Sequence, residues 1–69
     1  METLDLHGVK HQDAVIIAED FMLLNEPPFQ IITGNSPQMK KIVIDLLKKH
    51  DYKYKYPHEH NMGALIIYA

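Results

Sequence analysis

The spacing of apolar and polar residues predicts six regular elements. Short runs that alternate or are continuously apolar, each bounded by glycine or proline, predict strands at residues 4–7, 29–32, 52–56 and 64–68. Apolar residues three and four apart predict two helices, at residues 11–24 and 37–50. The expected order is therefore β-α-β-α-β-β, with no internal repeat.

The second helix has the clearest pattern, whereas the first has more apolar residues than one buried stripe needs. In the second helix we expect a buried stripe of Met39, Ile42, Val43, Leu46 and Leu47. In the first we expect a buried stripe of Ala14, Ile17, Ala18, Phe21 and Leu24. Ile16 and Leu23 then point nearly opposite the core, which favours a homodimer through this helix. The alternative is that a small domain tolerates a few exposed apolar residues.

The order of the elements predicts the fold. Right-handed crossovers make the first two strands parallel and place both helices on one face of the sheet. We therefore expect an α/β two-layer sandwich with a mixed, mostly parallel four-stranded sheet whose other face is open to water. Lysines in residues 52–56 are typical of an edge strand. The tyrosines of that strand either stack nucleic-acid bases or pack under the helices. We expect the second, which places Lys53 and Lys55 on the open face beside Asp5 and His7.

Length and composition indicate one small domain spanning residues 1–69. The absence of cysteine excludes disulfides and thiolate zinc sites. No apolar run approaches the roughly 20 residues of a membrane helix. The first residues form neither a basic region nor an apolar signal segment, so we expect a cytoplasmic protein with no membrane partner.

The charges are divided unequally between the two halves of the chain. Residues 1–35 have one lysine and six acids, a net charge of −5, whereas residues 36–69 have six lysines and three acids, a net charge of +3. A basic face of this kind suits a polyanion such as DNA or RNA. The alternative is that the lysines only solvate a helix and an edge strand. Because the chain has no arginine, contacts with nucleic acid would use lysines and backbone amides.

The first candidate site is Asp5 with His7, in the run Leu4-Asp5-Leu6-His7-Gly8. Residues two apart on a strand share a face, so both polar side chains project together from the face opposite Leu4 and Leu6. A carboxylate beside an imidazole can orient it, tune its pKa or share a metal ion with it. The alternative is an ordinary surface pair.

The second candidate site is the turn after the strand at residues 29–32. It consists of Thr33, Gly34, Asn35 and Ser36. Gly34 permits a tight turn, and Ser36 before Pro37 is typical of a helix start. A helix N-terminus binds phosphate well, and Lys40 and Lys41 in the first turns can add charge. The alternative is a routine turn. Ligands of parallel sheets bind at the carboxyl ends of strands, so we expect both candidate sites to share one rim.

Together these motifs resemble the Smr (small MutS-related) domain family. That family pairs a Leu-Asp-x-His-type first strand with a His-Gly-x-Gly or Thr-Gly-x-Gly loop, here Leu4-Asp5-Leu6-His7-Gly8 and Ile31-Ile32-Thr33-Gly34. Ser36 stands where the family has its second glycine. The resemblance implies a sandwich similar to the C-terminal domain of translation initiation factor three. It also implies that Asp5 and His7 are the residues tied to endonuclease activity.

The chemistry expected from these residues is phosphodiester cleavage. His7 could take a proton from a ribose 2′-hydroxyl or from water while Asp5 holds its tautomer. Alternatively, the pair could ligate a divalent cation such as Mg²⁺ or Mn²⁺. A non-catalytic nucleic-acid-binding module and a protein-interaction module acting through the first helix are the other functions we consider. His58 and His60 could bind a metal, but a closed zinc site needs about four ligands, so we expect no dedicated metal site.

Overall fold

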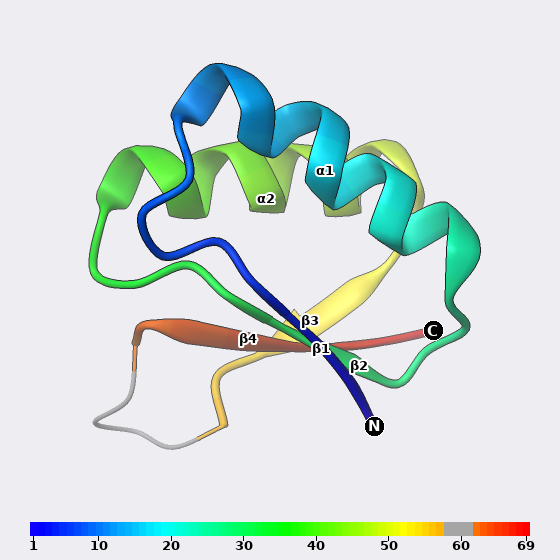
Figure 1. Ribbon diagram of the computed structural model, residues 1–69. Coiled ribbons are helices and arrows are strands. Elements are labelled where there is room, and N and C mark those ends of the chain that lie inside the picture. The colour runs from blue at the N-terminus through cyan, green and yellow to red at the C-terminus, as the bar shows by residue number, and fades with distance from the viewer. Residues whose placement is uncertain (58–61) are drawn as a thin grey trace.

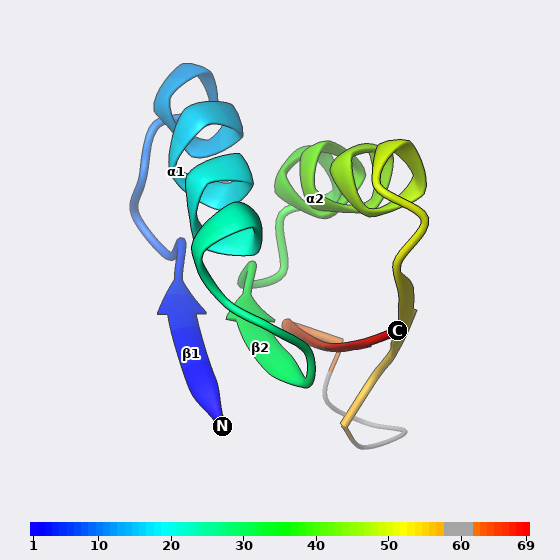
Figure 2. The same ribbon diagram turned by 90° about the vertical axis from the view of Figure 1, so that its right-hand side faces the viewer.

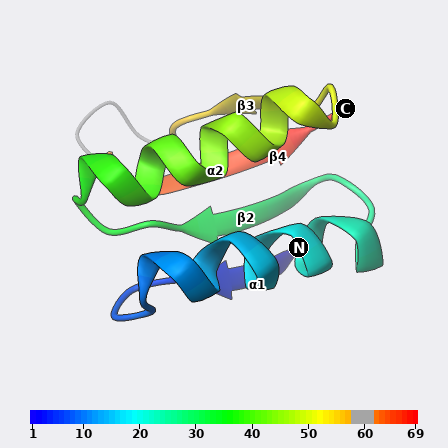
Figure 3. The ribbon, with the colours of Figure 1, turned by 90° about the horizontal axis from the view of Figure 1, so that it is seen from above.

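The computed structural model describes residues 1–57 and 62–69 and contains the six elements in the expected order. Their bounds are β1 Glu2–Asp5, α1 His11–Leu24, β2 Phe29–Ile32, α2 Pro37–Lys49, β3 Lys53–Lys55 and β4 Ala64–Tyr68. Figure 1 shows two layers, with both helices on one face of the sheet. Seen from above, α1 lies over β1 and α2 over β4 (Figure 3). The described residues therefore form a small α+β domain.

The strands form one mixed sheet in the order β1-β2-β4-β3. β1 and β2 are parallel, as the crossover rule predicts, but β4 is antiparallel to both of its neighbours, β2 and β3. The expectation of a mostly parallel sheet is therefore wrong, because only one of the three strand pairs is parallel. The reason is that only residues 56–63 connect β3 to β4, which is too short for the crossover that a parallel strand needs, so β4 runs back antiparallel and lies between β3 and β2.

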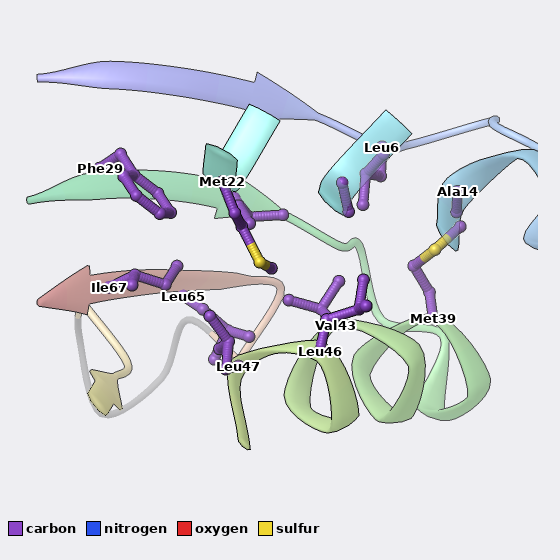
Figure 4. Close-up of a cluster of buried hydrophobic side chains, with 12 residues drawn as sticks. Leu6, Ala14, Met22, Phe29, Met39, Val43, Leu46, Leu47, Leu65 and Ile67 are labelled. Atoms are coloured by element: carbon purple, nitrogen blue, oxygen red, sulfur yellow. The ribbon is translucent and has the colours of Figure 1, made fainter. Parts of the chain in front are cut away.

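The core lies between the helices and the sheet (Figure 4). Its largest fully buried side chains are Phe29, Leu6, Met22, Ile31, Leu47, Leu65, Ile67 and Val43. Successive side chains of a strand alternate between faces, so Phe29 and Ile31 of β2 lie opposite Leu65 and Ile67 of β4 on the helix side. Phe29 also packs edge-to-face on Phe21, with ring centroids 5.2 Å apart.

The two helices differ in how well their buried faces were predicted. α2 buries Met39, Val43, Leu46 and Leu47, with Ile42 packed partly against the core, as expected. α1 buries Ala14 and Ala18, as expected, and Phe21 packs partly against the core, but the third buried residue is Met22. Ile17 and Leu24, which we expected in the core, are exposed. Ala14, Ala18 and Met22 are spaced four apart and form the ridge of α1 that faces the core, whereas Ile17 and Leu24 lie outside this ridge.

β3 is an edge strand, as the lysines predict. Tyr52, Tyr54 and Tyr56 are packed against the core, which confirms the expected side for the tyrosines, and Lys53 and Lys55 are exposed. However, the lysines do not lie beside Asp5 and His7. β2 and β4 separate β3 from β1, which at sheet spacing is roughly 14 Å. Adjacency in the sheet is set by strand order, which the alternation within one strand does not reveal.

The helices of the described residues are too short or too polar to cross a lipid bilayer. The longer one, α1, has 14 residues.

Candidate functional site

Three segments that are distant in sequence meet at one rim of the sheet. They are the residues after β1, the turn after β2 and the residue before β4, and we call their meeting point the corner (His7, Thr33, Gly34 and Gly63). A Cβ placed on Gly34 would lie 3.5 Å from Cδ2 of the His7 ring. A Cβ placed on Gly63 would lie 3.5 Å from the backbone of Gly34. The expectation that both motifs share one rim is therefore confirmed (Figure 2).

Backbone pairing brings His7 to this place. The amide of Leu6 donates to the carbonyl of Ile32 at 2.8 Å, which continues the β1–β2 pairing one residue beyond the strand. Leu6 is fully buried and anchors the segment, while Gly8, with φ +82°, turns the chain back towards α1. His7 thus stands exposed between a buried leucine and a turn, with its ring against Gly34.

The carbonyl of Gly63 holds the corner together. It accepts hydrogen bonds from the amides of Thr33 and Gly34, both at 2.9 Å. The buried Thr33 hydroxyl lies 2.9 Å from the carbonyl oxygen of Gly34 and 3.3 Å from that of Gly63. Two of the amides that we expected to be offered to a phosphate are therefore used inside the fold. Thr33 stabilises the corner rather than facing a ligand.

The start of α2 keeps fewer free amides than a bare helix N-terminus. The Ser36 hydroxyl accepts from the amide of Met39 at 3.2 Å, and Pro37 has no amide hydrogen. Within the described part of the chain, the amides of Asn35 and Gln38 have no hydrogen-bond partner. Ser36 thus caps the helix. Its expected role as a cap is confirmed.

Asp5 contacts the backbone of His7 rather than its ring. Its Oδ1 accepts a hydrogen bond from the His7 amide at 2.8 Å. This short-range bond from an aspartate stabilises the turn after β1. The expectation that Asp5 fixes the tautomer of the imidazole does not match this contact.

The predicted lysines are divided between two ends of the molecule. Lys40 and Lys41 lie in the first turns of α2, next to the corner. Lys41 forms an ion pair with Asp45 at 2.7 Å, with both side chains exposed, which is a weak interaction that a phosphate can displace. Lys53 and Lys55 lie on the far edge of the sheet and take no part in the corner.

Metal ligands are sparse in the structure. Among residues 1–57 and 62–69, no group of three or more histidine, aspartate or glutamate side chains could hold a metal ion. His58, Glu59 and His60, where we considered adventitious metal binding, lie outside the described residues.

One polar cluster had no signal in the sequence. Glu19 of α1 accepts hydrogen bonds from Lys49 Nζ and pairs with His50 Nε2, both at 2.8 Å, at the C-terminal end of α2. These hydrogen bonds, from Lys49 first and then His50, lower the pKa of Glu19 below its ordinary value. Glu19 is some 30 residues from both partners in the sequence, so no local pattern predicts these contacts. Gly63 was also missed, and only its position directly before a strand distinguishes it.

Comparison with protein-family models, with curated proteins and with solved structures finds no match for this chain. Its function must therefore be inferred from the residues that meet at the corner.

Proposed function

We propose that this chain is an Smr-like domain that binds the phosphate backbone of DNA or RNA at the corner and cuts it slowly with the help of His7. The observation that carries the proposal is the position of the His7 ring beside Gly34, where a Cβ would lie 3.5 Å from the ring. It supports a site in which the two motifs of the resemblance act together. The likeness to the C-terminal domain of translation initiation factor three is part of the same proposal, and the two-layer arrangement of the elements supports it.

The phosphate is held at the start of α2. Gly34, with φ +70°, has no side chain to keep a phosphate away from the backbone. The amides of Asn35 and Gln38 are the donors that remain, and the positive end of the helix dipole favours an anion. Lys40 and Lys41 add positive charge one turn further along α2. This arrangement recognises the phosphate and reads no base.

His7 supplies the acid–base chemistry. The free nitrogen of its imidazole can take a proton from a ribose 2′-hydroxyl or from a water molecule that attacks the phosphorus. The bond from phosphorus to the leaving sugar oxygen breaks in the same step, and that oxygen takes a proton from solvent. General base help of this kind is worth about 10²–10⁴ in rate, which corresponds to a slow nuclease. Asp5 acts as a positioning residue, since it fixes the backbone that carries the ring. Its carboxylate is also the kind of oxygen ligand that Mg²⁺ or Mn²⁺ prefers.

A second candidate function is nucleic-acid binding without cleavage. The contact that favours it is the hydrogen bond from the His7 amide to Asp5, because a carboxylate engaged with the backbone does not orient the ring. In that case the corner holds a phosphate and His7 contributes charge or a hydrogen bond only.

The test is incubation with labelled single-stranded, duplex and branched DNA and RNA, with and without Mg²⁺ or Mn²⁺. The variants are His7→Ala and, as a matched control, His11→Ala, which removes an imidazole four residues away at the start of α1. A nuclease loses about 10²-fold or more of its cleavage rate in His7→Ala, keeps its affinity for the substrate, and is unaffected in His11→Ala.

The outcomes separate the two functions. Affinity that falls with salt, without any cleavage product, identifies the non-catalytic module, because phosphate contacts release counterions. If the chain binds neither DNA nor RNA even at low salt, both proposals are wrong. Equal cleavage by His7→Ala and the unaltered chain contradicts the role of His7.

A further inference from the structure

The outer surface of α1 is apolar although α1 lies at the surface of the molecule. The exposed fractions are 64% for Ile16, 39% for Ile17, 67% for Leu23 and 83% for Leu24. In Figures 2 and 3 no other described element lies over the side of α1 that faces away from α2 and the sheet. We call these four residues together with Asp20 the α1 patch. Several exposed apolar side chains on one side of a surface helix are typical of a binding site.

The geometry of the α1 patch is that of a helix-packing surface. Residues spaced four apart form the ridge Ile16–Asp20–Leu24, and residues spaced three apart form the ridge Ile17–Asp20–Leu23. Such ridges fit the grooves of a second helix. Asp20 is exposed and lies where the two ridges cross, so a helix that docks there covers its carboxylate.

The charge on α1 decides what kind of helix fits. Residues 11–24 contain three acids and neither lysine nor arginine. A carboxylate that is covered without a cation is strongly destabilising, so the partner must bring one. Two α1 helices packed against each other with their Asp20 residues facing would place two carboxylates in one apolar interface, because residues 11–24 contain no lysine. An anionic membrane or a nucleic acid would be repelled by the same acids.

We propose that the α1 patch docks an amphipathic helix of another protein, with an apolar stripe against the four exposed side chains and a lysine or arginine opposite Asp20. A docked helix of this kind makes its contacts through apolar side chains spaced three and four residues apart. The α1 patch and the corner are separate sites, because the corner is formed by His7, Thr33, Gly34 and Gly63 and uses no residue of α1. The chain can then hold nucleic acid and a protein partner at the same time.

The test uses two synthetic peptides of 18 residues that share a leucine stripe at helical spacing and carry either lysine or glutamate at the other positions. We expect the lysine peptide to bind the full chain and the glutamate peptide not to bind, measured by fluorescence anisotropy. Asp20→Asn keeps the shape of the side chain and removes its charge, and it should weaken the lysine peptide about thirtyfold. Leu23→Ser should weaken it by a similar factor. Glu2→Gln, an exposed acid outside the α1 patch, should leave the affinity unchanged.

Several results would overturn the proposal. Equal binding of both peptides shows that charge plays no part, and binding of neither shows that the α1 patch docks no basic helix. Sedimentation that gives a dimer of the chain alone, converted to monomer by Leu23→Ser, shows that a second copy covers the α1 patch. Binding to phosphatidylglycerol vesicles that Leu23→Ser abolishes assigns the surface to a membrane. Leu23→Ser leaves nucleic-acid binding at the corner unaltered, so failure of one proposal is distinguishable from failure of the other.

Discussion

α1 and α2 cover the same face of the same sheet, yet they present opposite surfaces to solvent. The outer side of α2 carries the exposed and charged Lys41, Asp45 and Lys48, whereas that of α1 carries exposed isoleucine and leucine. α2 therefore follows the ordinary pattern of an amphipathic surface helix. In α1 the buried inner face consists of two alanines and Met22, whereas two isoleucines and two leucines are exposed on the outer face. The difference shows that apolar residues on a helix mark the core only where the remaining face is polar.

The largest expected effect is the difference in stability between a leucine substitution in the core and the same substitution in the α1 patch. Leu47 of α2 is fully buried, so Leu47→Ala removes apolar contacts and leaves a cavity that should lower the free energy of unfolding by about 2–5 kcal/mol. Leu23→Ala, the same change on the exposed face of α1, should alter it by only about 0.5 kcal/mol. Urea unfolding followed by circular dichroism measures both. Similar losses in the two variants would mean that Leu23 is buried in solution.

The next effect concerns the turn that leads into α2. Gly34 has φ +70°, and Gly34→Ala should lower the free energy of unfolding by about 1–2 kcal/mol because a Cβ is strained in this region. A Cβ there makes only ordinary contact with the His7 ring at 3.5 Å, so the cost is in the backbone. Gly34→Asn, which tolerates positive φ better, should lose less in the same urea titration. Equal losses would contradict this origin of the cost.

The N-termini of the two helices should respond in opposite directions. Ser36 caps α2 through the amide of Met39, so Ser36→Ala should lower the free energy of unfolding by about 1 kcal/mol. Lys10 at the start of α1 makes no side-chain cap hydrogen bond, so Lys10→Asp should raise it by about 0.5–1 kcal/mol. Thermal unfolding of both variants provides the measurement. A loss of stability in Lys10→Asp would show that Lys10 has contacts beyond the cap.

The smallest effect is the pH dependence of the contact between the two helices. The lowered pKa of Glu19 means that its carboxylate is stabilised in the folded state. The contribution is therefore complete above the ordinary value of 4.5 and is lost as pH falls through the lower folded value. Unfolding measured from pH 6 to pH 3 should show a smaller decline in Glu19→Gln than in the unaltered chain. Glu26→Gln, an exposed acid outside the cluster, should keep the full decline.

Local patterns were enough to predict the elements and several of their roles. Alternation in residues 52–56 placed the tyrosines inward and the strand at an edge, and the pair Ser36–Pro37 marked the start of α2. These predictions succeed because strand alternation and helix capping depend on residues only a few positions apart. On the inner face of α1 the burial of Ala14 and Ala18 was predicted, but Ile17 and Leu24 were wrongly placed inside and Met22 was missed. Hydrophobicity alone does not show which of several apolar stripes of a helix faces the core.

The sequence by itself determined the order of the elements, the parallel pairing of β1 with β2 and the convergence of His7 and Gly34 at one rim, since chain connectivity and crossover handedness act without detailed packing. Only the tertiary structure decided that β4 lies antiparallel between β2 and β3. It also decided that the Gly63 carbonyl accepts hydrogen bonds from the amides of Thr33 and Gly34, and that Glu19 pairs with Lys49 and His50. Apart from the pairing of β3 with β4, these contacts join residues about 30 or more positions apart. Their formation depends on how whole elements pack, which no short stretch of the chain encodes.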